Sequence, residues 1–191
     1  KKILSKKILN TYGKNNSNLM SHVSHKVKGV EFSTGSLGHG LPYAVGKALG
    51  EKINGSKNKV YVVMSDGEIN EGTTWESLLI ASKHELDNLI VIIDYNKIQS
   101  LDTIENTLGL EPFKQKWESF GWKAINIDGH DHSLIKKTFS KLPVANNKPI
   151  VIIADTTKGK GVSFMENSVL WHYRSPQGEE FNSAIKELKK K

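Results

Sequence analysis

The sequence has 191 residues, enough for one domain with an apolar core, and its formal net charge of +7 comes from lysine-rich ends on a nearly neutral body. Because no aromatic residues alternate with the basic ones and no apolar run approaches a membrane span, we expect no nucleic-acid binding, no membrane span and no signal peptide. The absence of cysteine excludes disulfides, thiolate metal sites and cysteine nucleophiles, and is compatible with a cytoplasmic location.

The first fifty residues alternate between polar loops and one helix. A short amphipathic pattern ends in a Gly/Asn/Ser loop at residue 17, and the next polar segment contains His22 and His25. By residue type alone, both histidines are ordinary surface residues. Residues 33–40 form a glycine-rich turn before a helix over 41–50 that carries small residues on one face. That turn could wrap a ligand or simply begin the helix.

Residues 60–93 predict one βαβ unit. Two apolar runs rich in β-branched residues, 60–64 and 89–93, are typical of strands that are covered on both faces of a parallel sheet. Between them, a helical stripe is formed by Trp75, Leu78, Leu79 and Ser82. A strand, a crossover helix and a second strand place the two strands side by side and parallel.

This crossover brings two distant polar residues to one edge of the sheet. Asp66 follows the first strand and Asn96 follows the second, and parallel neighbours end at the same edge. The Asp66 carboxylate, the Asn96 amide oxygen and the backbone carbonyl of Ile98 are hard oxygen ligands of the kind that Mg²⁺ prefers. The sequence therefore predicts a site for Mg²⁺ and a diphosphate.

The second half of the chain continues the α/β pattern. A helix that begins at 111–113 carries Phe113, Trp117 and Phe120, which we assign to the core. Strands are expected at 122–127 and 150–154, and a helix at 132–141 is expected to have Asp131 as its N-cap, without a chemical role for His130. The Lys158–Gly161 loop lacks P-loop spacing. A basic helix at 178–191 should lie on the outside.

Asp66-Gly67-Glu68 followed by Asn96 resembles the thiamine-diphosphate motif. The chain from about Ser17 to Phe181 is similar to the N-terminal subunit of split transketolases, in the segments STGSLGHGL, EINEGTTWE, LDNLIVIIDYNKIQS, DGHD, KGKGVSFME and WHYRSP. The resemblance implies the thiamine-diphosphate-binding fold, a parallel sheet with helices on both faces. It departs from the family where Val23 replaces a proline and where Ser65 replaces the first glycine of Gly-Asp-Gly.

The resemblance also implies residue roles. Cofactor contacts would come from Gly35, Ser36, Leu37, Asp66, Gly67, Glu68, Glu71, Asn96, Ile98, Lys158 and His172. Catalytic roles would fall to His22 at the donor sugar, to His172 near the diphosphate and the substrate channel, and to Glu71 at the subunit interface. Plainer explanations exist for two of them, because the helix macrodipole favours an acid at Glu71 and because His172 could belong to a packing segment.

The implied reaction is the transfer of a two-carbon ketol unit from a ketose, often phosphorylated, to an aldose. The implied partner is a separate pyrimidine-domain subunit, in an α2β2-like assembly or dimers of it. We expect residues 1–191 to form one diphosphate-side domain that is incomplete at its N-terminus, because the family's opening helix and Ser-Lys-Gly-His stretch are absent. Two alternatives stay open: another thiamine enzyme (a 2-oxo acid dehydrogenase component or a deoxyxylulose-phosphate synthase), or a non-catalytic subunit.

Overall fold

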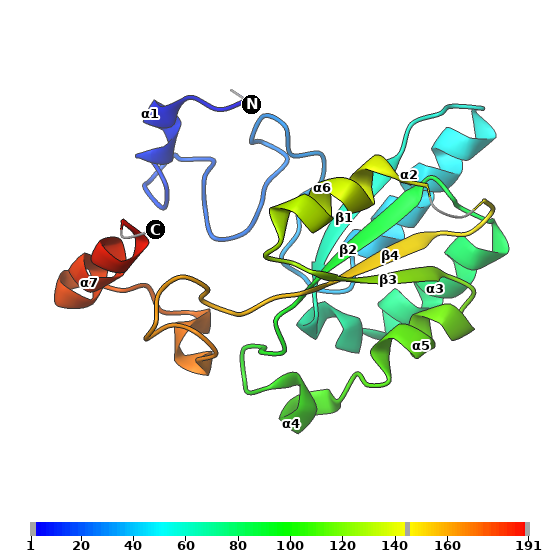
Figure 1. Ribbon diagram of the computed structural model, residues 1–191. Helices are drawn as coiled ribbons and strands as arrows, with labels where there is room; N and C mark the ends of the chain where they lie inside the picture. The colour runs from blue at the N-terminus through cyan, green and yellow to red at the C-terminus, as the bar shows by residue number, and fades with distance from the viewer. Residues whose placement is uncertain (1–2, 144–145, 190–191) are drawn as a thin grey trace.

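A computed structural model of the chain describes residues 3–143 and 146–189 (Figure 1). Four parallel strands form one sheet in the order β1-β2-β4-β3. They are β1 (Val60–Ser65), β2 (Leu89–Tyr95), β3 (Lys123–Asp128) and β4 (Ile150–Asp155). Each lies within two residues of the predicted run, so the predicted α/β fold with a parallel sheet is confirmed.

Burial along the strands follows their position in the sheet. Central strands β2 and β4 are buried over most of their length, whereas edge strands β1 and β3 alternate between buried and exposed residues. Central strands of a parallel sheet have both faces covered, and the continuous Ile/Val runs of β2 and β4 fit that environment. The carboxyl ends of all four strands meet at one edge, where the loops toward α4 and α7 leave the sheet (Figure 1).

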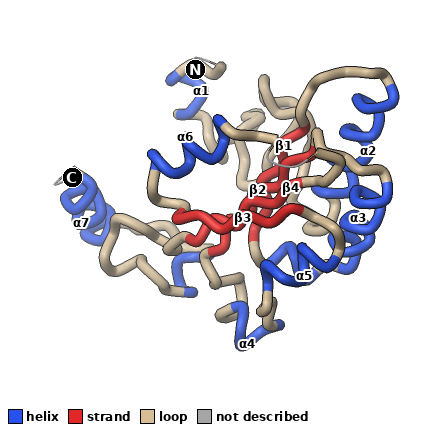
Figure 2. Tube along the Cα trace, turned by 45° about the vertical axis from the view of Figure 1, so that its right-hand side comes forward, coloured by secondary structure: helices blue, strands red, loops and turns tan. Residues whose placement is uncertain are grey.

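Helices cover both faces of the sheet, as the sequence predicts. On one face lie α2 (Gly40–Ile53), α3 (Gly72–Lys83) and α5 (Phe113–Ser119), and on the other lies α6 (His132–Ser140) (Figures 1 and 2). The larger apolar cluster fills the first interface, and a smaller one, centred on Ile90, Ile150 and Ile152, lies under α6. The sheet and its helices therefore form a three-layer unit.

The predicted buried stripe of α3 is wrong in part. Leu78 is fully buried, but Leu79 is 58% exposed, and the buried face is completed by small residues, Thr74, Ser77 and Ala81. Small side chains let α3 approach α2 and the sheet closely, which turns the larger Leu79 outward. Hydrophobicity alone could not identify this face because the residues that it buries are not the most apolar ones.

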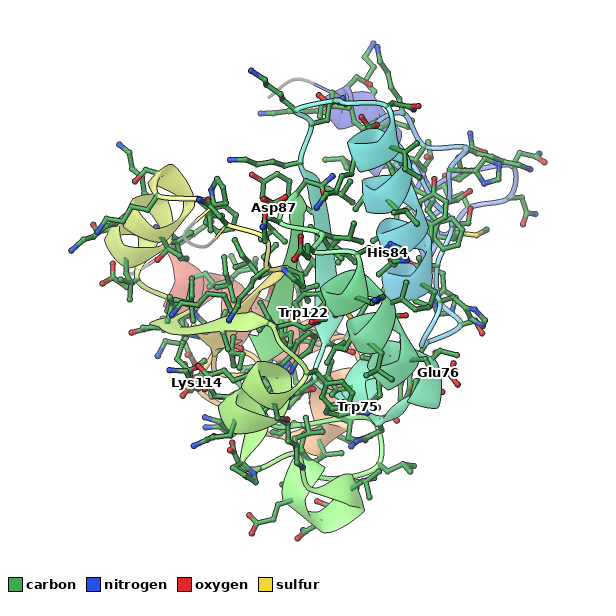
Figure 3. All side chains as sticks on the ribbon, turned by 90° about the vertical axis from the view of Figure 1, so that its right-hand side faces the viewer. Trp75, Glu76, His84, Asp87, Lys114 and Trp122 are labelled. Atoms are coloured by element: carbon green, nitrogen blue, oxygen red, sulfur yellow. The ribbon has the colours of Figure 1, made fainter. Side chains whose placement is uncertain are left out.

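The predicted core residues of α5 are confirmed. Phe113 and Trp117 are buried, and the Trp117 ring meets the Trp122 ring edge to face at a centroid distance of 5.0 Å. Phe120 is half-buried and packs on Trp75 of α3, with ring centroids 5.4 Å apart. Figure 3 looks onto this layer and labels Trp75 and Trp122.

Short elements complete the chain: α1 (Lys6–Leu9), α4 (Ile104–Leu108), α7 (Gly178–Leu188) and the 3-10 helices η1 (Gly67–Asn70) and η2 (Val169–His172). Asp131 caps α6 by accepting hydrogen bonds from Ser133 N and Leu134 N, as predicted. Helix α7 lies away from the sheet, on the outside of the molecule (Figure 1), and ends at Leu188; residues 190–191 of the predicted helix lie outside the described residues. None of the described helices has the length and apolar character needed to cross a membrane.

Candidate active site

The acidic turn after β1 and the loop after β2 meet at Asp66. The Asp66 side chain is 1% exposed, and its two oxygens accept hydrogen bonds from backbone N–H groups. Gly67 N donates to Oδ1 at 2.8 Å, and Lys97 N donates to Oδ2 at 2.6 Å. The parallel pairing of Ser65 with Asp94 brings the two loops into this contact. Asp66 and the Asn96–Ile98 loop are thus adjacent although they lie far apart in the sequence.

Burial without a cationic partner destabilises the charged form of Asp66. Removal of the carboxylate from water, with a smaller contribution from the nearby Asp94, raises its pKa to about 6 against the opposing hydrogen bonds from Lys97 and Gly67. Within the described part of the chain, no ion pair involves Asp66. A bound cation would stabilise a buried carboxylate in this position and would lower its pKa again.

The donor set around Asp66 fits a hard divalent ion. Asn96 Oδ1 lies in the same loop and accepts the N–H of Ile98 at 3.0 Å, while Ile98 is buried and bridges to Thr103. One carboxylate, one amide oxygen and one backbone carbonyl match the oxygen ligands that Mg²⁺ uses while it keeps sites for water and phosphate. The described residues contain no cluster of three or more His, Cys, Asp or Glu side chains that could hold a metal ion.

Glu68 joins the acidic turn to the glycine-rich turn. Its buried carboxylate accepts the N–H of Gly38 at 3.0 Å. Burial raises the pKa of Glu68, while hydrogen bonds from Gly38 and Gly40 at the start of α2 lower it. In this structure the carboxylate therefore supports the N-terminus of α2, and direct contact of Glu68 with a cofactor stays a prediction.

The two turns fit together closely at Gly38. Thr73 Oγ1 donates to the Gly38 carbonyl at 2.6 Å, and a Cβ at Gly38 would lie 2.8 Å from Cβ of Glu71. Glu71 is exposed and is the N-cap residue of α3, but its side chain makes no capping hydrogen bond. Its carboxylate is therefore open to a partner, and this geometry is compatible with both explanations proposed for Glu71.

The structure places His22 against Gly35 of the predicted cofactor turn, whereas His25 contacts Ser33 at the start of that turn. A Cβ at Gly35 would lie 2.7 Å from the His22 ring, so this turn can carry only glycine while the imidazole is there. His25 is held by Ser33, whose Oγ accepts the His25 N–H at 2.9 Å and lies 2.7 Å from its Nδ1. Both rings are exposed, as are Ser36 and Leu37 beside them.

Lys158 connects the loop after β4 to the rest of the site. It lies close enough to Asp66 to lower the pKa of that carboxyl electrostatically. It also acts with partial burial to lower the pKa of His172, which favours the neutral imidazole. His172 packs edge to face against Tyr173, with ring centroids 4.8 Å apart. Lys158 thus acts electrostatically on two predicted site residues that are 106 positions apart in the sequence.

Sequence reasoning missed three residues that shape the site: Lys97, Thr73 and Gln99. Lys97 has a positive φ of 68° and holds Asp66, and Gln99 packs against Gly67 and donates to Asn70 Oδ1 at 3.0 Å. None of the three stands out by residue type. Beside this loop, a cavity of about 830 Å³ is lined by Asn96, Lys97 and Ile98 and by residues after β4. Asp66 is not part of its lining, but it accepts a hydrogen bond from Lys97, which is part of the lining.

Comparison with known proteins gives consistent results. Residues 4–191 match the family described as transketolase, thiamine diphosphate binding domain. The chain is 46% identical over 182 residues to a subunit of the apulose-4-phosphate transketolase from Actinobacillus succinogenes, covering 95% of this chain and 66% of that protein. It is 36% identical over 184 residues to a 6-deoxy-6-sulfo-D-fructose transketolase subunit from a Clostridium species, covering 96% and 67%.

Solved structures show the same fold. The transketolase from Campylobacter jejuni has a TM-score of 0.88 at 32% identity, covering 98% of this chain and 30% of that one. The transketolase from Leishmania mexicana has a TM-score of 0.86 at 26% identity, covering 97% and 29%. The chain spans about two thirds of the curated subunits and under a third of these solved chains. It belongs to the transketolase family, in the part that forms the thiamine diphosphate-binding domain.

Proposed function

We propose that this chain is the diphosphate-side subunit of a Mg²⁺- and thiamine-diphosphate-dependent transketolase. It would transfer a two-carbon ketol unit from a ketose phosphate to an aldose. The observation that carries the proposal is the buried Asp66 carboxylate, which is held by two backbone N–H groups beside Asn96 and Ile98. A carboxylate with a pKa raised by burial and no ion pair among the described residues suits a cation-binding role.

When bound, thiamine diphosphate supplies the electron sink for carbanion chemistry. Asp66, Asn96 and the Ile98 carbonyl would hold the metal, and Gly67 would leave room for the diphosphate. The hydrogen bond from Gly38 to Glu68 fixes the turn that contains Gly35, Ser36 and Leu37. That turn would lie against the aminopyrimidine end of the cofactor.

The remaining site residues would act on the substrate and on protons. His22, next to Gly35, would hydrogen-bond a donor hydroxyl close to the reacting carbon. His172, whose lowered pKa favours its neutral form, can accept a proton beside Lys158 and the diphosphate. Lys158 supplies positive charge for phosphate oxygens. Glu71, exposed at the start of α3, would hydrogen-bond the partner subunit.

The partner we propose is a separate polypeptide that carries the pyrimidine-binding domain, in an α2β2-like assembly in the cytoplasm. Support comes from two relatives that are named as single subunits of an apulose-4-phosphate transketolase. The same names make apulose 4-phosphate the first donor to test. Nucleic-acid and membrane partners are not proposed.

The test is calorimetric titration of thiamine diphosphate in the presence of Mg²⁺ into the chain assembled with its partner subunit. We expect binding that requires Mg²⁺ and is lost in Asp66→Ala. The control is Asp87→Ala, which removes a carboxylate near the amino end of β2, away from the site (Figure 3). This variant should bind like the wild type.

The outcomes separate the alternatives. Mg²⁺-dependent binding followed by ketol transfer from a ketose phosphate supports the proposal. Binding without any sugar turnover would indicate a non-catalytic subunit, and acetyl transfer from pyruvate would indicate another thiamine enzyme. Binding that survives in Asp66→Ala would mean that the metal site lies elsewhere.

A further inference from the structure

Lys97 occupies an unusual backbone conformation at the centre of the candidate metal loop. Its φ is +68°, in the left-handed region that few residues other than glycine and asparagine adopt. Both of its backbone groups are used: its N–H donates to Asp66 Oδ2 at 2.6 Å, and its carbonyl accepts the N–H of Ile104 at 2.9 Å. The strained residue is thus fixed from both sides, and strain held in this way is typical of functional sites.

Lys97, at its positive φ, links Asp66 to the other two predicted ligands, Asn96 and Ile98. The Lys97 N–H is directed at Asp66, whereas the next N–H, that of Ile98, returns to Asn96 Oδ1 at 3.0 Å. The φ and ψ of Lys97 set the angle between these two peptide groups. In the observed loop, both hydrogen bonds are made with Lys97 at a positive φ. The relative position of the three ligands therefore depends on the backbone conformation of Lys97.

The Lys97 side chain contributes less than its backbone. Its ammonium lies 2.6 Å from Asp155 Oδ1 and 5.4 Å from the centroid of the Tyr95 ring. Both ends of the ion pair are more than half exposed, at 51% and 62%, and exposed pairs of this kind contribute little. The feature that matters at position 97 is therefore tolerance of a left-handed backbone.

We propose that Lys97 is a positioning residue, which arranges Asp66, Asn96 and Ile98 for metal binding through its left-handed backbone. This inference rests on the proposed function, because it assigns the geometry of the same metal site. Residues that accept positive φ should keep the site, and residues that resist it should lose the site even when the chain stays folded.

The experiment compares four substitutions in the chain assembled with its partner. Lys97→Gly and Lys97→Asn accept positive φ readily but lack the ammonium, and Lys97→Ala lacks the ammonium while it tolerates the backbone about as lysine does. The β-branched Lys97→Val resists positive φ. Mg²⁺ is titrated calorimetrically at a saturating concentration of thiamine diphosphate. We expect Mg²⁺ affinity to stay within about threefold of wild type for Gly, Asn and Ala, and to fall about tenfold or more for Val, since added left-handed strain of ~1–2 kcal/mol corresponds to such a factor. Asp155→Asn, which removes only the ion pair, should resemble Lys97→Gly.

Glu85 provides the matched control, because its φ is also positive, at +50°, and it lies at the end of α3 away from the site. Glu85→Gly and Glu85→Val should change the melting temperature in the same order as the Lys97 variants, but leave Mg²⁺ affinity unchanged. Equal Mg²⁺ affinity for Lys97→Gly and Lys97→Val, or a loss in Lys97→Ala as large as in Lys97→Val, would overturn the inference while the proposed function stands. A wild-type assembly that binds no Mg²⁺ and cofactor would overturn both.

Discussion

Substitution of Gly38 by alanine should destabilise the junction between the two turns of the site. Gly38 has a φ of +83°, and an added Cβ would lie 2.5 Å from Thr73 Oγ1 and 2.8 Å from Glu71 Cβ. Left-handed strain in alanine costs ~1–2 kcal/mol, and overpacking typically costs ~1–3 kcal/mol. Alanine also lowers the conformational entropy of the unfolded chain, which stabilises the folded state by ~0.4–1 kcal/mol. The free energy of unfolding should therefore fall by about 2–4 kcal/mol.

The assay is urea unfolding followed by circular dichroism, with Gly46→Ala as the control. Gly46 lies inside α2 with no neighbouring heavy atom within 4 Å of an added Cβ, so alanine there should stabilise the chain by ~0.5–1 kcal/mol. Because Gly38 N donates to Glu68, Gly38→Ala should also weaken thiamine diphosphate binding. A Gly38→Ala variant as stable as the wild type would refute the close fit of the two turns.

Three further predictions concern acidity, packing and the donor site. Because the pKa of Asp66 is raised to about 6, the metal-free folded chain holds a proton on this carboxyl below that pH. Mg²⁺ affinity, measured by calorimetry, should therefore fall about tenfold between pH 7.5 and pH 5. A constant affinity over this range would contradict the role of Asp66 as a metal ligand. In the same urea assay, Trp117→Ala should lower the free energy of unfolding by ~3–5 kcal/mol because Trp117 is buried, and Leu79→Ala should lower it by at most ~0.5 kcal/mol because Leu79 is exposed. Similar losses for the two variants would contradict the observed burial. His22→Ala should raise the KM for the donor ketose about three- to tenfold, which is the factor expected for one lost hydrogen bond. His25→Ala should leave this KM unchanged. The opposite result would assign the donor contact to His25.

The sequence by itself determined the strands and the meeting of the two ligand loops. Central strands β2 and β4 are nearly continuous apolar runs rich in β-branched residues, a pattern that is typical of strands buried on both faces of a parallel sheet. Because a βαβ crossover makes its two strands parallel neighbours, Asp66 and the loop at Asn96 had to reach the same edge. These features depend on local pattern and on chain connectivity, and both can be read from the residues in order.

Only the tertiary structure decided how these parts fit together. The sheet order places β4 between β2 and β3, and the close approach of α3 selects Thr74 and Ala81 for its buried face and excludes Leu79. The hydrogen bond from Gly38 to Glu68 joins the turn before α2 to the turn after β1, and the positive φ of Lys97 occurs where the loop after β2 meets Asp66. Such contacts require segments that are distant in the sequence to be placed within a few tenths of an ångström of the correct position. No local pattern of residues encodes this placement.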